Sequence, residues 1–359
     1  MAKIYVYIGR FQPFHNAHAH VLERASAIAD RIVVLVGSAY QPRTIKNPFT
    51  YDERAEIIED WAYHKLPDGK LNIKPLVDQP YSDPKWIQSV QKQVSAAIVE
   101  MGYDESETEI VLTGSDRDDS TWYLRVFPQW GVDLIAPVPK GLELNATGIR
   151  KRLFEEENPG WPEVPTETSE FLNVFALSDT YSVLKAEYDF MKRYKAAWEA
   201  APYAPTFHTV DAVVIQSGHV LVVERGALPG KGLWALPGGF LNQNERMHVA
   251  VTRELREETG LKVPEKILQA SIKDKEIFDH PDRSLRGRTI TTAFLIRLDD
   301  TMPLPKVKGQ NMPLHESRGE IIVETAKAFW LPINEALANS ELWFEDHHSI
   351  LAWAVDGAQ

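Results

Sequence analysis

The chain has 359 residues, a length that predicts two domains rather than one. Hydrophobic residues make up 44% and charged residues 25%, as in soluble globular proteins, and the formal net charge of −12 argues against broad binding to nucleic acid or anionic membranes. The absence of cysteine excludes disulfides, thiolate chemistry and cysteine-ligated zinc, and the lack of an apolar run of transmembrane or signal-peptide type leads us to expect a cytoplasmic protein.

The first half of the chain alternates strand-like and helix-like segments. Strands are expected near residues 3–8, 31–36, 71–77, 110–113 and 132–136. Helices are expected from about residue 18 to 30 and near residues 51–63 and 86–101. This order predicts an α/β domain with a Rossmann-like, doubly wound parallel sheet, in which ligands bind at the carboxyl ends of the strands.

The turn after the first strand, residues 9–18 (GRFQPFHNAH), carries groups that suit phosphate binding. Gly9 lets backbone approach a ligand, and the following helix N-terminus offers N–H groups and a positive dipole. Arg10, His15 and His18 add side-chain donors. A bare H-x-x-H pair is more typical of surface residues or of a metal pair. Its position after the first strand and the preceding G-R-F-x-P-F favour the phosphate site.

This turn resembles that of the H-x-G-H nucleotidyltransferase superfamily, and specifically of archaeal-type nicotinamide mononucleotide adenylyltransferases. Segments 43–54 (RTIKNPFTYDER), 114–130 (GSDRDDSTWYLRVFPQW) and 145–150 (NATGIR) are similar to further parts of that family. The last resembles the phosphate-binding motif I-S-S-T-x-x-R, carried onto Thr147 and Arg150. Two departures stand out, because Ala17 replaces the family glycine and Asn145-Ala146 replaces the serine pair.

The resemblance implies adenylyl transfer, in which the phosphate of nicotinamide mononucleotide attacks the α-phosphorus of ATP, pyrophosphate leaves and NAD forms. It implies Mg²⁺ or Mn²⁺ as the metal and positioning with charge neutralisation as the source of catalysis. The residues implied are His15, His18 and Arg150 for catalysis and Gly9, Arg10, Phe11 and Thr147 for substrate binding.

Three further residues are candidates for substrate contacts. Trp86 is a candidate for stacking on the nicotinamide ring, although a core tryptophan on a helix is an equal alternative. Lys46 and Arg125 are candidates for phosphate contacts.

Prolines separate the two halves of the chain. Residues 169–198 have a helical pattern, which Pro202 and Pro205 end. We therefore expect a first domain at 1–185, a helical connection and linker at 186–205, and a second domain at 206–359.

The second half begins with two short strands, expected at 209–215 and 219–224 and joined as a hairpin by Ser217-Gly218. Further strands are expected near 267–277 and 289–298, and a closing helix over 344–355. His347 and His348 on that helix are expected to be surface residues rather than ligands.

Residues 239–261 (GFLNQNERMHVAVTRELREETGL) form the most informative segment of the second half. On a helix, Met247, Val251 and Leu255 make one apolar stripe, and Gly260 is suited to end it. The opposite side carries carboxylates that suit Mg²⁺ or Mn²⁺, namely Glu254, Glu257 and Glu258. An E-x-x-E-E helix taken alone is more often a solvated face whose glutamates pair with Arg253 and Arg256.

Every fixed position of G-x5-E-x7-R-E-U-x-E-E-x-G-U (U, a bulky apolar residue) is satisfied here, and this pattern is that of the Nudix hydrolases. The resemblance implies metal-dependent hydrolysis of a nucleoside diphosphate linked to another moiety, on an α/β/α sandwich with a mixed sheet. It makes Glu254, Glu257 and Glu258 metal ligands, with Glu257 and Glu258 central to catalysis. The carbonyl of Gly239 is a further metal contact, and Arg253 orients a glutamate.

Substrate choice depends on residues outside this pattern. Segment 279–292 (DHPDRSLRGRTITT) resembles that of ADP-ribose pyrophosphatases, and Arg283, Arg286 and Arg288 are positioned to clamp a diphosphate or a ribose phosphate. A mobile charged loop is the alternative. A general base is expected in segment 306–324, where the sequence does not decide among Glu316, Glu320 and Glu324.

The two resemblances together indicate a known bifunctional arrangement that makes NAD in one half and hydrolyses ADP-ribose to AMP and ribose 5-phosphate in the other. The expected partners are therefore ATP, nicotinamide mononucleotide, NAD and ADP-ribose, with no nucleic acid or membrane, and the oligomeric state stays open. Two alternatives remain. The acceptor is another phosphorylated compound, such as phosphopantetheine or nicotinate mononucleotide, or the Nudix half senses ADP-ribose without hydrolysing it.

Overall fold

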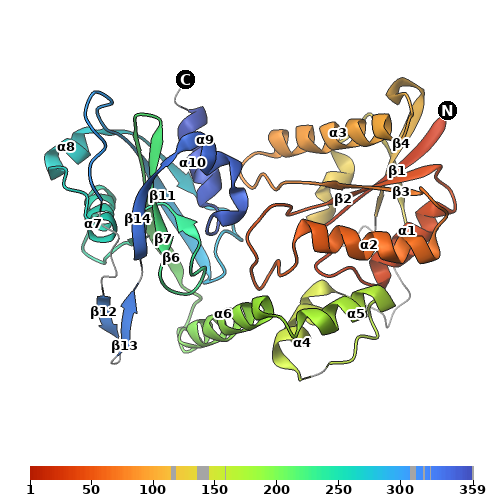
Figure 1. Ribbon diagram of the computed structural model, residues 1–359, viewed down its shortest axis with the longest axis horizontal. Helices are drawn as coiled ribbons and strands as arrows, with labels where there is room; N and C mark the ends of the chain where they lie inside the picture. The colour runs from red at the N-terminus through yellow and green to blue at the C-terminus, as the bar shows by residue number, and fades with distance from the viewer. Residues whose placement is uncertain are drawn as a thin grey trace. The chain divides into compact units, whose positions relative to one another are not determined.

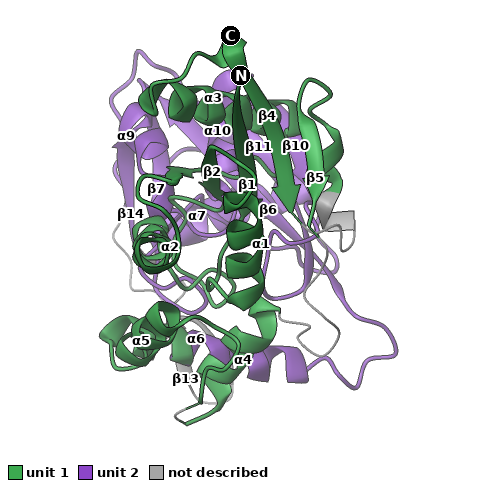
Figure 2. Ribbon diagram, turned by 90° about the vertical axis from the view of Figure 1, so that its right-hand side faces the viewer, with its two compact units in different colours: residues 1–185 green, residues 186–359 purple. Residues whose placement is uncertain are grey.

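The computed structural model describes residues 1–114, 119–135, 145–157, 159–307, 313–317, 320–323 and 325–357. The chain divides into two compact units, Met1–Lys185 and Ala186–Gln359 (Figure 2). The division falls inside one helix, α6 (Asp179–Ala196). No helix in the described ranges is both long and apolar enough to span a bilayer.

Unit 1 is built on a five-stranded parallel sheet with the order β3-β2-β1-β4-β5 (Figure 1). This order confirms the doubly wound fold that the sequence predicted. The order of strand addition reverses at β1, because β2 and β3 lie on one side of it and β4 and β5 on the other. The strands are β1 (Ala2–Gly9), β2 (Arg31–Val36), β3 (Leu71–Pro75), β4 (Thr108–Gly114) and β5 (Gly131–Leu134).

Alternating side chains of β1 build the cores on both faces of this sheet. Tyr5 and Tyr7 pack with α1 (Asn16–Ser26) and α2 (Tyr51–Lys65), whereas Ile4 and Val6 pack with α3 (Asp83–Glu100) (Figure 1). Short 3-10 turns precede β4 (Glu105–Glu107) and β5 (Asp119–Arg125). The sheet is thereby covered on both sides, as a parallel sheet requires.

Three helices complete unit 1 after the sheet. They are α4 (Ala146–Glu155), α5 (Thr166–Phe175) and the first part of α6. The helical pattern expected over 169–198 is thus two helices, because α5 ends at Ala176 and the chain turns before Asp179.

Unit 2 contains a seven-stranded mixed sheet, which also confirms the prediction. Its main order is β10-β11-β6-β7-β14, with β8 paired to β7 and β9 to β6. Only β11 and β6 run parallel among these pairs. The strands are β6 (Thr206–Gln216), β7 (His219–Arg225), β8 (Trp234–Ala235), β9 (Gly238–Phe240), β10 (Ile272–Phe278), β11 (Arg288–Arg297) and β14 (Thr325–Pro332), and a separate hairpin joins β12 (Pro313–Ser317) to β13 (Glu320–Val323).

The helices of unit 2 cover the two faces of the sheet. Val251 and Leu255 of α7 (Met247–Thr259) pack on Ala212 of β6, whereas α10 (His347–Asp356) packs on the opposite face. Met247 is partly exposed, so the buried stripe begins one turn later than expected. The remaining helical segments are α8 (Glu265–Ala270), α9 (Ile333–Ala338) and the 3-10 turn Ser340–Leu342.

The strand expected over 267–277 is wrong in its first half. Residues 265–270 form α8, and β10 starts at Ile272. Pro264 stands immediately before the helix, and Glu, Lys, Leu, Gln and Ala in the segment EKILQA are all good helix formers. The segment is therefore helical although it contains Ile267.

The end of α7 provides a test of local backbone strain. Gly260 has φ 61°, a left-handed conformation, and its N–H donates to the carbonyl of Arg256 at 2.9 Å. We expect Gly260→Ala to lower the free energy of unfolding by about 1 kcal/mol, because a Cβ disfavours this conformation. Gly260→Asn should cost less, since asparagine tolerates it. Urea unfolding of both variants measures the difference, and an alanine variant as stable as the wild type would contradict it.

Candidate active sites

The two histidines of the first turn lie together at the start of α1. His15 precedes the helix, and its backbone N–H donates to Nδ1 of His18 at 3.3 Å. The two imidazole rings stack with centroids 3.6 Å apart, and Phe11 packs edge-on against His18 at 4.8 Å. His15 is buried and His18 half-buried. Ala17 is also buried in this first turn, so the methyl group that replaces the family glycine is accommodated there.

Arg150 joins the start of α4 to the same turn. Its Nη1 donates to the carbonyl of Gln12 at 2.5 Å and its Nη2 to Oγ1 of Thr147 at 3.2 Å. Asn145 caps α4 by accepting the N–H of Gly148 at 2.6 Å. Burial, together with the nearby charge of Arg10, lowers the pKa of Arg150 to about 10. The structure therefore brings together the two candidate phosphate-binding segments, which lie far apart in the sequence.

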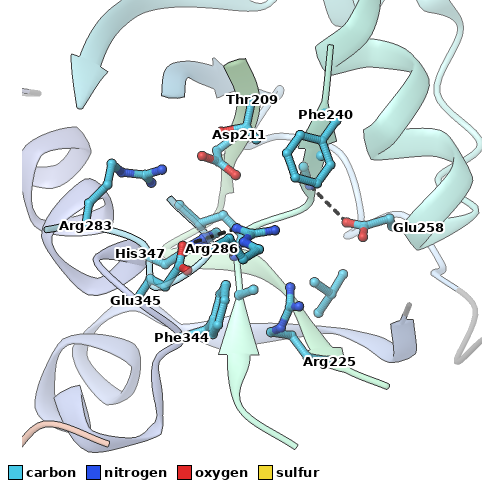
Figure 3. Close-up of a pocket in the computed structure, with 15 residues that line it drawn as sticks. Thr209, Asp211, Arg225, Phe240, Glu258, Arg283, Arg286, Phe344, Glu345 and His347 are labelled. Carbon is cyan, nitrogen blue, oxygen red and sulfur yellow. Dashed lines mark hydrogen bonds and ion pairs between the residues drawn. The ribbon is translucent and has the colours of Figure 1, made fainter. Parts of the chain in front are cut away.

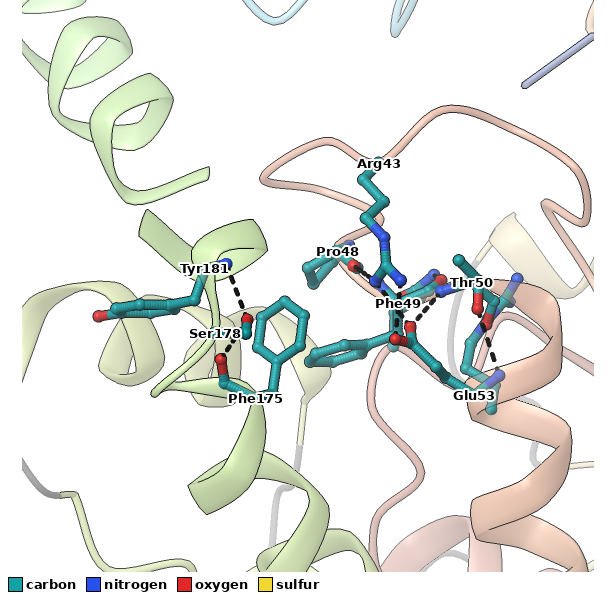
Figure 4. Close-up of polar contacts among 10 residues, drawn as sticks. Arg43, Pro48, Phe49, Thr50, Glu53, Phe175, Ser178 and Tyr181 are labelled. Carbon is teal, nitrogen blue, oxygen red and sulfur yellow. Dashed lines mark hydrogen bonds and ion pairs between the residues drawn. The ribbon is translucent and has the colours of Figure 1, made fainter. Parts of the chain in front are cut away.

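Segment 43–54 forms a third side of this site, and Gln12 connects it to the turn. The side-chain amide of Gln12 donates to the carbonyl of Phe49 at 2.8 Å and accepts its N–H at 3.1 Å. Arg43 makes two 2.7 Å bonds to Glu53, and Phe49 packs edge-on against Phe175 at 5.0 Å (Figure 4). Gln12 was not among the residues selected from the sequence. Its position between apolar residues in GRFQPF was the available signal of a buried amide.

The other candidates in unit 1 lie at its periphery. Trp86, in the first turn of α3, is half-buried and contacts Trp122 with ring centroids 5.5 Å apart. Arg125 is exposed beside an apolar pocket lined by Phe127 and Trp130, and Lys46 is half-buried in the loop before α2.

The acidic face of α7 is organised by Arg253. The guanidinium makes two bonds of 2.8 Å to Glu245, one of 2.7 Å to Glu254 and one of 3.0 Å to Glu257. The bonds from Glu245, followed by the other carboxylates, raise the pKa of Arg253 above its usual value. Glu254 and Glu258 are buried, and the Glu257 side chain is 41% exposed.

Two glycines let the carboxylates of α7 approach the backbone of β9. The N–H of Gly238 donates to Glu258 at 2.9 Å. A Cβ at Gly239 would lie 2.7 Å from the Glu254 carboxylate, and one at Gly238 would lie 2.2 Å from the carbonyl of Val210. The structure thus places Gly239, Glu254 and Glu258 side by side, as the Nudix pattern implied.

These residues offer the donors that a divalent ion prefers, since all are hard oxygens. Within the described residues, however, no three acidic or histidine side chains are already grouped as a metal site. Arg253 explains this, because it pairs with both Glu254 and Glu257. These oxygen donors fit a divalent ion that would replace Arg253 as the partner of Glu254 and Glu257, with the two bonds from Arg253 to Glu245 kept.

A pocket lies next to these carboxylates (Figure 3). Arg286 lies between two aromatic rings, 5.2 Å from the centroid of Phe240 and 5.7 Å from that of Phe344. Arg225 covers Phe344 at 3.9 Å. Two cations and two aromatic faces therefore line a pocket that ends at Glu258, an arrangement that suits an anionic ligand with a planar ring.

The three candidate arginines of segment 279–292 have different positions. Arg286 lines the pocket and donates to Glu345 at 3.3 Å. Arg283 lines it too but makes two bonds, of 2.9 and 2.7 Å, to Asp346. Although burial opposes its charge, Asp346 raises the pKa of Arg283 above its usual value. Arg288, at the start of β11, pairs with Asp279 at 3.8 Å.

The expectation that His347 and His348 are surface residues is wrong. His347 is 7% exposed and lines the pocket, and its Nδ1 accepts the backbone N–H of Leu236 at 2.9 Å. Nδ1 is therefore unprotonated, and burial lowers the pKa of His347 to about 3. His348 is half-buried, with Nε2 2.9 Å from the carbonyl of Leu337. The spacing of His347 from Ile350 and Leu351, on one helix face, was the overlooked signal.

The general base remains undecided. Glu316 and Glu320 belong to the hairpin of β12 and β13, where only the backbone is described, and Glu324 lies outside the described residues.

Comparison with known proteins supports both halves of the chain. The family described as NUDIX domain matches residues 205–354, and the family described as Cytidylyltransferase-like matches residues 6–152. A nicotinamide/nicotinic acid mononucleotide adenylyltransferase of Acinetobacter baylyi is 32% identical over 186 residues, which cover 51% of this chain and 92% of that protein. A nicotinamide-nucleotide adenylyltransferase of Thermococcus onnurineus is 31% identical over 174 residues, which cover 48% of this chain and 83% of that protein.

Crystal structures of a bifunctional NMN adenylyltransferase/ADP ribose pyrophosphatase from Francisella tularensis are similar along nearly the entire chain, and one of them is complexed with AMP and a manganese ion. The chain of that complex and this chain are 31% identical, each is covered to 100%, and the TM-score is 0.88.

The buried His347 predicts a pH dependence of stability. Between about pH 6.5, its ordinary pKa, and pH 3, the unfolded chain binds a proton that the folded protein does not. The free energy of unfolding should therefore fall as the pH falls through this window, by up to about 1.4 kcal/mol per pH unit. The charged groups around His347 are Asp346, Arg283, Arg225 and Arg286.

His347→Asn isolates this effect, because the asparagine oxygen replaces Nδ1 as acceptor but does not titrate. Burial raises the pKa of Asp211 to about 6, which gives the opposite slope below that pH, but this contribution is common to both proteins. The difference in unfolding free energy between wild type and variant should shrink from pH 7 to pH 4. A difference that stays constant would contradict the buried, neutral state of His347.

Proposed function

The chain belongs to the family of bifunctional nicotinamide mononucleotide adenylyltransferases/ADP-ribose pyrophosphatases, and on this premise we propose which residues of each unit carry the reaction. Unit 1 transfers the adenylyl group of ATP to nicotinamide mononucleotide and releases pyrophosphate, and unit 2 hydrolyses ADP-ribose to AMP and ribose 5-phosphate. The observation that carries this conclusion is the likeness to one bifunctional protein over the full length of both chains.

In unit 1, the residues at the start of α1 and α4 hold the reacting phosphates. An oxygen of the mononucleotide phosphate forms a bond to the α-phosphorus of ATP, and the bond from that phosphorus to the bridging oxygen of pyrophosphate breaks. His15 and His18 lie at the N-terminus of α1, where backbone N–H groups and their side chains favour negative charge. Arg10 and Arg150 supply positive charge from both sides of the turn. Mg²⁺, when bound, neutralises further phosphate charge.

In unit 2, the carboxylates of α7 and the carbonyl of Gly239 would hold Mg²⁺ or Mn²⁺, which activates water and neutralises the diphosphate. Arg253 would stay bonded to Glu245, which leaves Glu254 and Glu257 available to hold the ion. Arg286 and Arg225 lie where the diphosphate or the adenine ring enters the pocket. Arg283 supports the pocket wall through Asp346 rather than reaching the substrate.

The alternative in which unit 2 binds ADP-ribose without hydrolysing it makes a distinct prediction for the ion pairs of Arg253 with Glu254 and Glu257. A unit that binds ADP-ribose without hydrolysing it would keep these pairs when the ligand is bound.

Separate inactivation of the two units tests the assignment. Glu257→Gln removes one metal ligand and should reduce ADP-ribose hydrolysis by at least about 10-fold while NAD synthesis is unchanged. His18→Ala removes a donor at the phosphate site and should reduce NAD synthesis by about 100-fold while hydrolysis is unchanged. Both products are measured chromatographically with Mg²⁺ or Mn²⁺. ADP-ribose binding without AMP release by the wild type would support the sensor alternative.

Substitution of Trp86 tests the acceptor. Trp86→Ala should raise the KM for nicotinamide mononucleotide by about 10-fold through lost stacking and leave the KM for ATP unchanged. Trp130→Ala is the matched control, because Trp130 stacks on Phe127 within the same unit. Equal effects of both variants, or an effect on ATP, would assign Trp86 to the core instead.

A further inference from the structure

A buried arginine that was not selected from the sequence lies against the backbone of the adenylyl-transfer site. Arg54 of α2 is 1% exposed, and its guanidinium donates only to backbone carbonyls. Nη1 donates to the carbonyls of Arg10 and Gly37, both at 2.6 Å. Nη2 donates to Ser38 at 3.1 Å and Nε to Thr50 at 2.9 Å.

Three of these acceptors belong to two turns that leave the sheet side by side, and the fourth, Thr50, precedes α2. Arg10 follows β1, and Gly37 and Ser38 follow β2. The strands pair in parallel up to Gly9 opposite Val36, and the N–H of Gly37 donates to the carbonyl of Gly9 at 2.8 Å. Arg54 therefore connects the phosphate-binding turn to its neighbour at the edge where ligands bind.

Both turns hold side-chain-bearing residues in left-handed backbone conformations. Phe11 has φ 51° and Ser38 has φ 49°, a region that a Cβ disfavours. The carbonyl just before Phe11 and that of Ser38 itself are both acceptors of Arg54. Because the guanidinium is planar and rigid, its bonds fix the orientation of these peptide groups together.

The charge of Arg54 remains uncompensated by direct pairing. Within the described part of the chain, no carboxylate accepts a hydrogen bond from it. Burial lowers its pKa to about 10; the nearby charge of Asp78 opposes this lowering, and the charge of Arg10 adds to it. Arg10 likewise contributes to the lowered pKa of Arg150. Arg10 therefore opposes the charged state of both Arg54 and Arg150, and a polyphosphate bound at this turn would relieve that repulsion.

We propose that Arg54 is a positioning residue of the adenylyl-transfer site, which holds the turns after β1 and β2 in the conformation that binds the ATP phosphates and adds its buried positive charge to their binding. The proposal rests on the function assigned to unit 1. Arg54 does not touch the substrate, and it acts through the backbone of Arg10 and Ser38.

The test uses the full-length protein with Arg54→Lys and Arg54→Met. The lysine variant keeps the positive charge but loses the planar guanidinium that donates to several carbonyls, and the methionine variant loses both the charge and these donors. We expect Arg54→Lys to raise the KM for ATP by about 10-fold, the loss of one charge-assisted hydrogen bond, and to lower kcat for NAD synthesis, with the KM for nicotinamide mononucleotide nearly unchanged. Arg54→Met should raise the KM for ATP further. Hydrolysis of ADP-ribose by unit 2 should be unchanged and serves as the internal control.

Arg43→Lys is the matched control, because Arg43 also joins the loop to α2, through Glu53. If Arg54→Lys lowers the melting temperature as Arg43→Lys does but leaves the KM for ATP at the wild-type value, Arg54 is only structural and the proposal is overturned. Calorimetric titration with ATP separates the proposal from the assigned function. A wild type that binds ATP but makes no NAD refutes the function alone, whereas an unchanged Kd for ATP in both Arg54 variants refutes the proposal.

Discussion

The cost of removing charged groups from water governs the architecture of both sites. A buried guanidinium must find enough acceptors to replace its hydration, and the two units solve this differently. In unit 1, Arg54 and Arg150 donate mainly to backbone carbonyls, so their positive charge remains available to an anion. In unit 2, Arg253 and Arg283 donate to carboxylates, so positive charge is largely neutralised where the acidic residues gather. One site is thereby prepared for phosphate and the other for a cation.

This difference corresponds to the two reactions. Adenylyl transfer needs no nucleophilic side chain, and the work of the protein is to hold highly charged phosphates in line. A loop fixed by Gln12 and Arg150 at the start of a helix provides that rigidity. Hydrolysis of a diphosphate instead requires an activated water, which a metal ion at the site proposed on the glutamates of α7 would supply. Each unit has its own sheet and core for its reaction.

Much of the fold was predictable because it depends on short-range patterns. The alternation in β1 and the strand–helix order predicted the parallel sheet, and the stripe of Val251 and Leu255 predicted how α7 packs. The phosphate-site histidines and the Nudix carboxylates are likewise carried by local motifs. Failures occurred where the outcome depended on distant segments. His347 accepts its hydrogen bond from Leu236, 111 residues away, and the hydrogen bonds of Arg54 reach two turns that lie far from it in the sequence. The helix at 265–270 was a different failure, because apolar content outweighed helix propensity in the prediction.

The glycine pair of β9 has a consequence for how this protein can vary. Gly238 and Gly239 fill the space between β6 and α7 with backbone alone, and there is no smaller residue that could replace them. The Glu254 and Glu258 carboxylates thus lie directly against the backbone of β9, with no intervening side chain whose size could vary. A Cβ at Gly239 would meet the Glu254 carboxylate at 2.7 Å, whereas one at Gly238 would meet the carbonyl of Val210 in β6 at 2.2 Å. We therefore expect any substitution at Gly238 or Gly239 to shift the surrounding backbone or glutamates, whereas the side chains that line the pocket can change one at a time.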